Sequence, residues 1–151
     1  IQLNVLIESS RVTILFLPTA VLARLFSNKK LKMRSLRCLL AGGEALPNKA
    51  ANVVIENESD LMLVNIYGPT ECTTATTYFQ INQLILEKKS ISIGKAISGA
   101  QLFLLNDEEQ LITQPNEIGE IYIGGAGVCA GYLNNEKANT KLIGIVIFKA
   151  V

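Results

Sequence analysis

Histidine is entirely absent from this chain of 151 residues, and cysteine occurs only three times. Without histidine, the chain has no base for a Cys–His nucleophile and no histidine ligand for zinc. The cysteines, Cys38, Cys72 and Cys129, lie far apart in the sequence and lack the spacing of a zinc site. We therefore predict buried free thiols, which favour a reducing, cytoplasmic setting.

Long apolar runs and an excess of one charge are also missing. Glu8, Arg11 and Arg24 interrupt the apolar N-terminal region, so no run reaches the roughly 18 residues of a membrane-spanning helix. No signal-peptide pattern is found before this region. With a formal net charge of +1 and 49% hydrophobic residues, the composition favours a soluble globular protein that has neither a membrane nor a nucleic acid as its partner.

One basic segment leaves two interpretations open. Its five cationic residues are Lys29, Lys30, Lys32, Arg34 and Arg37. Apolar residues, among them Met33 and Leu36, are interspersed with the charges. This mixture favours a solvated connector over a phosphate-binding patch.

The first 71 residues alternate short, branched apolar runs with stretches of helical spacing. The expected elements are a helix at 1–9, a strand at 12–17, a helix at 19–27, a strand at 36–41, a helix at 47–57 and a strand at 61–67. Such alternation is typical of βαβ units with a parallel sheet. The fold class predicted for this part is α/β.

The second half of the sequence predicts short strands separated by turn residues. We expect these strands at 76–81, 100–106, 111–112 and 120–123. The chain is therefore predicted to have a parallel-sheet βαβ lobe over residues 1–75 and a small β-rich, barrel-like lobe over residues 76–151. An atypical tail is expected after about residue 140.

Each strand of the first lobe ends in a distinctive turn. The three turns occupy residues 17–19, 41–44 and 67–71. In open α/β sheets, ligands bind at the carboxyl ends of the strands. The three turns therefore predict one common site.

The third turn carries side chains suited to a nucleotide. Asn65 and Tyr67 lie two apart on a predicted strand, so both point to one face, where an amide can bond a purine edge and a ring can stack on it. Thr70 offers a hydroxyl to a phosphate oxygen, and Glu71 offers a carboxylate to a magnesium ion carried by the nucleotide. The alternative is a purely structural turn, with Thr70 and Glu71 capping the next helix or filling a solvent edge.

Three motifs resemble those of adenylate-forming enzymes in the nonribosomal peptide synthetase branch. The string Asn-Ile-Tyr-Gly-Pro-Thr-Glu at 65–71 matches the core signature of that family. Residues 36–46 look like its upstream glycine loop, and residues 119–134 look like its later glycine-rich motif. The resemblance covers about residues 10–135 and implies a fragment of a larger adenylate-forming fold, with residues 1–75 as the C-terminal part of a nucleotide-binding subdomain.

The resemblance implies an activity and its cofactors. Family members activate an amino acid with ATP and Mg²⁺ as aminoacyl-AMP, then pass it to the phosphopantetheine thiol of a peptidyl carrier domain. It implies catalytic roles for Thr70 and Glu71, with Glu71 as the metal ligand. The nucleotide contacts implied are Gly43, Glu44, Ala45, Asn65, Tyr67, Gly68 and Thr70. An acyl-CoA or aryl-acid ligase fragment and a non-catalytic nucleotide-binding remnant are the alternatives.

The resemblance also implies a pocket for the side chain of the substrate. Its members here are Phe16, Leu40, Gly42, Ile66, Thr74 and Ala75. None is charged, and a buried unpaired charge is costly, so the expected substrate is an aliphatic amino acid. The alternative is that Phe16, Leu40 and Ile66 are ordinary core residues.

Several segments of a complete family member are not recognisable in this sequence. They are the Ser/Thr/Gly-rich phosphate loop, the aspartates for the α-amine and the ribose, and the C-terminal lobe with its catalytic lysine. We therefore expect negligible turnover from these 151 residues alone. Gly125, Gly127 and Ala130 have the spacing of a dinucleotide fingerprint, but residues 131–135 are a poor helix start, so a structural role is expected.

Overall fold

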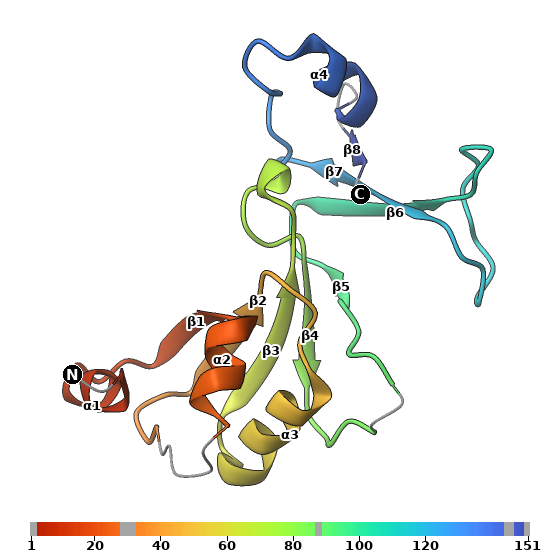
Figure 1. Cartoon of the computed structure of the whole chain (residues 1–151). Coiled ribbons are helices and arrows are strands. Elements are labelled where there is room, and N and C mark those ends of the chain that lie inside the picture. The colour runs from red at the N-terminus through yellow and green to blue at the C-terminus, as the bar shows by residue number, and fades with distance from the viewer. Residues whose placement is uncertain (1–2, 28–32, 87–88, 144–146, 150–151) are drawn as a thin grey trace. The chain divides into compact units, whose positions relative to one another are not determined.

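The computed structural model describes residues 3–27, 33–86, 89–143 and 147–149, the last of these as backbone only. The helices and strands are shown in Figure 1. In chain order they are α1 (Leu3–Ser9), β1 (Ile14–Pro18), α2 (Thr19–Leu25), β2 (Cys38–Gly42), α3 (Asn48–Asn57), β3 (Met62–Tyr67), the 3-10 helix η1 (Thr70–Cys72), β4 (Thr77–Ile81), β5 (Lys95–Ala96), β6 (Ala100–Leu105), β7 (Glu120–Gly125), α4 (Glu136–Leu142) and β8 (Ile147–Lys149). Across the described residues, no helix has the length and hydropathy needed to cross a bilayer.

The first compact unit consists of Ile1–Tyr67 and Tyr78–Lys95. Its strands β1, β2 and β3 pair in parallel, with Leu17 opposite Ala41 and Ala41 opposite Asn65. They are the first three strands of a five-stranded sheet whose order is β1-β2-β3-β4-β5. The predicted α/β lobe is confirmed, and its six predicted elements end within two residues of the observed ones.

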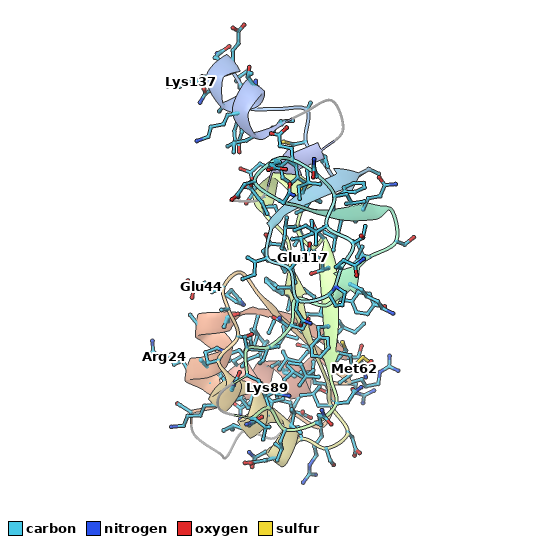
Figure 2. All side chains as sticks on the ribbon, turned by 90° about the vertical axis from the view of Figure 1, so that its right-hand side faces the viewer. Arg24, Glu44, Met62, Lys89, Glu117 and Lys137 are labelled. Atoms are coloured by element: carbon cyan, nitrogen blue, oxygen red, sulfur yellow. The ribbon has the colours of Figure 1, made fainter. Side chains whose placement is uncertain are left out.

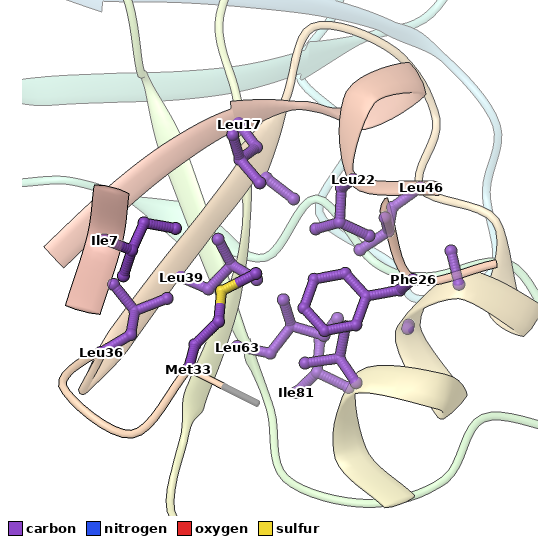
Figure 3. Packing of buried hydrophobic residues seen from close by; sticks show 14 residues of the cluster. Ile7, Leu17, Leu22, Phe26, Met33, Leu36, Leu39, Leu46, Leu63 and Ile81 are labelled. Carbon is purple, nitrogen blue, oxygen red and sulfur yellow. The ribbon is translucent and has the colours of Figure 1, made fainter. Parts of the chain in front are cut away.

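The core of this unit lies on the face of the sheet that α2 and α3 cover (Figures 1 and 3). Alternation along the strands decides which side chains enter it. Leu17, Leu39 and Leu63 are buried there, whereas Ile14 and Phe16 are exposed. Burying these large apolar side chains against the helices is what holds the sheet and helices together.

The basic connector is only partly solvated. Arg34 is exposed, as expected for a connector, and Lys29, Lys30 and Lys32 lie outside the described residues. Met33 and Leu36, however, are 1% and 4% exposed and belong to the core. The apolar half of the segment therefore packs inward, because a mixed sequence can divide its charged and apolar side chains between two sides.

The second unit consists of Gly68–Thr77 and Ala96–Val151. Strand β7 pairs antiparallel with β6 and with β8. The predicted β-rich lobe is confirmed, and its sheet is open: within the described residues its three strands form no closed barrel. Helix α4 was not predicted; it begins after Asn135, whose side chain accepts a hydrogen bond from the Ala138 amide at 3.1 Å.

The division of the chain differs from the simple boundary expected after residue 75. The chain enters the second unit at Gly68 and returns to the first at Tyr78. Hydrogen bonds within the second unit explain why. The Cys129 amide donates to the Glu71 carbonyl at 2.7 Å, and the Thr73 hydroxyl donates to the Gly127 carbonyl at 2.9 Å. Part of the predicted atypical tail forms β8. Residues 144–146 and 150–151 of this tail lie outside the residues that the structure describes.

Candidate functional site

Two of the three predicted turns are tied together in the first unit. Pro18 and Gly42 are register partners at the carboxyl ends of β1 and β2. The buried Thr19 hydroxyl lies 3.2 Å from the Gly42 carbonyl and 3.1 Å from the Glu44 carbonyl, so it donates to either oxygen. Gly43 has φ +97°, a left-handed conformation that favours glycine. The glycine loop therefore has a defined shape before any ligand arrives.

The implied nucleotide contacts of this loop are accessible. Gly43, Glu44 and Ala45 are all exposed, and the Glu44 side chain extends from the loop into solvent (Figure 2). Helix α3 follows directly, with Pro47 at its N-terminal cap position. The loop thus serves as a strand-to-helix turn and also exposes its backbone.

Asn65 is less available than the sequence suggested. It is 6% exposed, and its side-chain Nδ2 donates to the Ser92 carbonyl at 2.9 Å. That bond holds the segment before β5 and uses one of the two N–H groups of the side-chain amide, whose oxygen can accept from a purine amino group. Tyr67, two residues along β3, is half-buried.

Four of the six implied substrate-pocket residues share one face of the first sheet. Phe16 pairs with Leu40, and Leu40 pairs with Val64, which puts Ile66 on the same side. A Cβ on Gly42 would lie 2.7 Å from the Ile66 carbonyl oxygen, so Gly42 and Ile66 are in contact. Phe16, Leu40 and Ile66 do not belong to the core cluster. Phe16 is exposed, and Leu40 and Ile66 are half-buried, so the pocket and the core interpretations both stay open for these residues.

The remaining implied residues lie in the second unit, on the segment Gly68–Thr77. Pro69 leads into η1, and no side chain caps this short helix by a hydrogen bond. The helix-capping form of the structural alternative therefore has no support in this segment, and its other form, a solvent edge, stays open. Thr70 is exposed and Glu71 is half-buried.

A tyrosine that the sequence analysis missed is bonded to Glu71. The Tyr132 hydroxyl donates a short hydrogen bond to Oε1 of Glu71. This bond, together with desolvation, raises the pKa of Tyr132 to about 12. At neutral pH the phenol therefore stays protonated and remains a donor. The two residues are 61 positions apart, and no local pattern in the sequence links them.

The donor set around Glu71 suits a cation that brings most of its own ligands. Among the described residues, no partner is found for Oε2 of Glu71, and no three acidic, cysteine or histidine side chains cluster as a metal site. Mg²⁺ usually keeps several waters and binds through one or two carboxylates together with substrate phosphates. One available carboxylate oxygen fits that pattern.

A cavity of about 450 Å³ lies within the second unit. Thr74 and Ala75, both implied as substrate contacts, form part of its wall. Other residues on the wall were not anticipated; they include Ile97, Ala100, Ile123 and Val128. Cys72, also on the wall, is 3% exposed, and burial raises the pKa of its thiol. The cavity is large enough for a small organic ligand.

Thr76, beside this cavity, carries a polar atom in an unfavourable place. Its hydroxyl is buried, and in the described part of the chain it has only a weak interaction with the Cys72 sulfur. Thr76→Val keeps the shape and removes this poorly paired buried hydroxyl, so we expect the free energy of unfolding to rise by about 1 kcal/mol. Urea denaturation of the 151-residue chain measures this, with Thr77→Val as control. Thr77 is equally buried but has an interaction of its own, so this control should not gain stability.

The glycine-rich stretch has the structural role expected of it. Gly125 has φ +113°, and a Cβ there would collide with the Gly99 carbonyl oxygen. It also pairs with Ala100 at the end of β7. Close approach of two backbones, not a dinucleotide, explains why glycine stands at this position.

Comparison with known proteins decides the family. The model of the AMP-binding enzyme family matches residues 2–133. The chain belongs to this family. The resemblance to adenylate-forming enzymes is thereby confirmed for most of the chain, and the AMP-binding match ends close to the last predicted motif.

Relatives within the AMP-binding family are nonribosomal peptide synthetases. The chain is 34% identical over 131 residues to nonribosomal peptide synthetase asaC of Aspergillus flavus, covering 87% of this chain and 13% of that protein. It is 38% identical over 142 residues to surfactin synthase subunit 2 of Bacillus subtilis, covering 93% of this chain and 4% of that protein. The chain thus spans a small part of the length of these relatives.

A solved structure agrees with this placement in the AMP-binding family. PA1221, a nonribosomal peptide synthetase protein containing adenylation and PCP domains, matches with a TM-score of 0.90 and 30% identity. The match covers 98% of this chain and 27% of that one. The fold described above is therefore that of part of an adenylation enzyme.

Proposed function

We propose that this chain is part of an amino-acid adenylation domain that activates an aliphatic amino acid with ATP. The product would be an aminoacyl-AMP, passed on to the phosphopantetheine thiol of a peptidyl carrier domain. The observation that carries this proposal is the segment after β3, where exposed Thr70 and half-buried Glu71 follow Tyr67 in the family signature. Family membership and the peptide-synthetase relatives support it.

Each implied nucleotide contact has a physical role in this proposal. The exposed backbone at Gly43, Glu44 and Ala45 lies against the adenine, and Tyr67 stacks on the adenine. Asn65 accepts from the purine amino group through its amide oxygen. Gly68 lets the chain turn so that the Thr70 hydroxyl donates to a phosphate oxygen. Positioning and charge neutralisation of this kind are the main sources of rate in phosphoryl chemistry.

Mg²⁺ is the cofactor that the proposal assigns to Glu71. When bound with ATP, it would neutralise charge that develops on the phosphates. Glu71 would hold it through Oε2, the oxygen that Tyr132 does not occupy. No other acidic, cysteine or histidine cluster within the described ranges competes for this role.

The proposed substrate is a branched aliphatic amino acid such as isoleucine, leucine or valine. Phe16, Leu40 and Ile66 supply apolar surface, and Thr74 and Ala75 add small side chains. No charged side chain belongs to this set, so an acidic or basic substrate would lose its hydration without gaining a partner. The three free cysteines fit a reducing cytoplasm, which we also propose as the location.

Amino-acid-dependent ATP–pyrophosphate exchange by the full-length protein that carries this chain tests the proposal. Isoleucine, leucine and valine are compared with aspartate, lysine and an aryl acid. We expect exchange with the aliphatic acids and little with the others. Preference for a charged acid would contradict the assigned pocket, preference for the aryl acid would favour a different ligase, and no exchange with any acid would favour a nucleotide-binding remnant.

A further inference from the structure

Glu71 is held from two directions by the segment around residues 129–132. Its carbonyl accepts from the Cys129 amide at 2.7 Å, and its carboxylate oxygen Oε1 accepts from the Tyr132 hydroxyl. Both Glu71 and Tyr132 are half-buried. Backbone and side chain of the glutamate are therefore both restrained, which lowers the conformational freedom of this acidic residue.

Tyr132 is in turn clamped by one asparagine. Its backbone amide donates to Oδ1 of Asn139 at 2.6 Å, and Nδ2 of Asn139 donates to the Tyr132 carbonyl at 3.1 Å. Both hydrogen-bonding groups of the tyrosine backbone thus pair with a single side-chain amide. Gly131 makes room for this: its φ is +137°, and a Cβ there would lie 2.9 Å from Oδ1 of Asn139.

Asn139 is itself held in place by helix α4. Asn139 lies on α4, whose first turn is capped by Asn135, and its backbone amide bonds to the Asn135 carbonyl at 3.1 Å. A chain of hydrogen bonds therefore runs from α4 through Asn139 and Tyr132 to the carboxylate of Glu71. Every member belongs to the second unit.

We propose that Tyr132 is a positioning residue for Glu71 and that Asn139 supports it. The phenol holds Oε1, so the glutamate presents a single oxygen, Oε2, in a fixed direction to the cation of the bound nucleotide. The proposal rests on the metal-binding role of Glu71 in the proposed function. It extends the working part of the site to Asn139, beyond the residues that match the family model.

The physical benefit is preorganisation. A free glutamate side chain samples many rotamers and loses that freedom when a cation binds. A carboxylate already held by a hydrogen bond loses less, and it stays in the direction that the phosphates require. Groups that orient a metal ligand typically change metal affinity or activity by about 10- to 100-fold when they are removed.

Tyr132→Phe, made in the full-length protein that carries this chain, removes the phenol and keeps the ring. We expect the Mg²⁺ concentration for half-maximal ATP–pyrophosphate exchange to rise about 10-fold. The KM for the amino acid should stay unchanged, because the bond does not touch the substrate side chain. Calorimetry of ATP binding at several Mg²⁺ concentrations should show the same weakening without any turnover. Asn139→Ala should shift both readings in the same direction by a smaller factor.

Tyr78→Phe is the matched control, because Tyr78 lies in the first unit and its ring stays under the Lys95 ammonium when the hydroxyl is lost. It should leave the Mg²⁺ dependence unchanged. A merely structural role for Tyr132 would lower the folded fraction and reduce exchange equally at every Mg²⁺ concentration. That result, or an unchanged Mg²⁺ dependence in Tyr132→Phe, would overturn the proposal.

The hydrogen bond between Tyr132 and Glu71 can be measured separately from the activity, by NMR. In the 151-residue chain labelled with ¹³C at glutamate carboxyls, Glu71→Gln assigns the Glu71 signal. This signal should shift in Tyr132→Phe and Asn139→Ala and stay in place in Tyr78→Phe. An unmoved signal contradicts the positioning role. If the labelled signal moves but the wild-type protein exchanges with no acid, the proposed function fails and the coupling of Tyr132 to Glu71 stands.

Discussion

Replacing Glu71 by glutamine should lower amino-acid-dependent ATP–pyrophosphate exchange by about 100- to 1,000-fold. Glutamine has nearly the same shape, and its amide oxygen can still accept from the Tyr132 hydroxyl. Only the negative charge is lost, and with it the attraction for the cation of the bound nucleotide. The measurement is exchange by the full-length protein at saturating ATP and amino acid, repeated at several Mg²⁺ concentrations.

Glu117→Gln is the control for this substitution, because Glu117 is an exposed carboxylate in the same unit. Its exchange should equal that of the unchanged protein. Urea denaturation of both variants shows whether the fold persists. Near-normal exchange in Glu71→Gln, with the fold intact, would remove Glu71 from the catalytic machinery and leave it a structural acceptor for Tyr132.

Gly68→Ala should be the more damaging change to the structure of the site. A Cβ on Gly68 would lie 2.8 Å from the Thr76 amide nitrogen, 2.9 Å from the Thr74 carbonyl oxygen and 3.0 Å from the Ala75 Cα. All three are backbone atoms, which cannot rotate away as the end of a side chain can. The loop from Gly68 to Thr77 would have to open, at an expected cost of about 3 kcal/mol in the free energy of unfolding.

The same loop carries Thr70, Glu71, Thr74 and Ala75, so exchange should fall together with stability. Urea denaturation and the exchange assay measure the two effects. Gly127→Ala is a matched control in the same unit, because its Cβ would come no closer than 3.2 Å to the Cys72 carbonyl. Equal losses in the two variants would show that close packing around Gly68 has no special part in the site.

The secondary structure of the first unit could be predicted from the sequence because local patterns decide it. Branched apolar runs and helical spacing gave all six elements, and the turns after them marked the carboxyl ends of the strands. Alternation along β1 and β2 also separates Leu17 and Leu39, in the core, from Phe16 and Leu40 on the other face. These signals need only neighbours in the sequence.

The prediction was poorer where short elements depend on distant partners. Strand β5 has two residues, and β8 has three, so neither shows a period. Helix α4 contains Asn139 and Thr140 and has a weak helical pattern; its cap at Asn135 was the signal that could have revealed it. The burial of Met33 and Leu36 was missed for a related reason, since their charged neighbours dominate the composition of the connector.

The candidate site divides in the same way. The family signature, the glycine loop and the residue types suited to ATP and Mg²⁺ are properties of short segments, so the sequence by itself determined them. Only the tertiary structure decided that the side-chain amide of Asn65 donates to the Ser92 carbonyl and that the Tyr132 hydroxyl donates to one carboxylate oxygen of Glu71. Such hydrogen bonds join residues 27 and 61 positions apart, and they form because folding brings buried polar groups together that must then find partners.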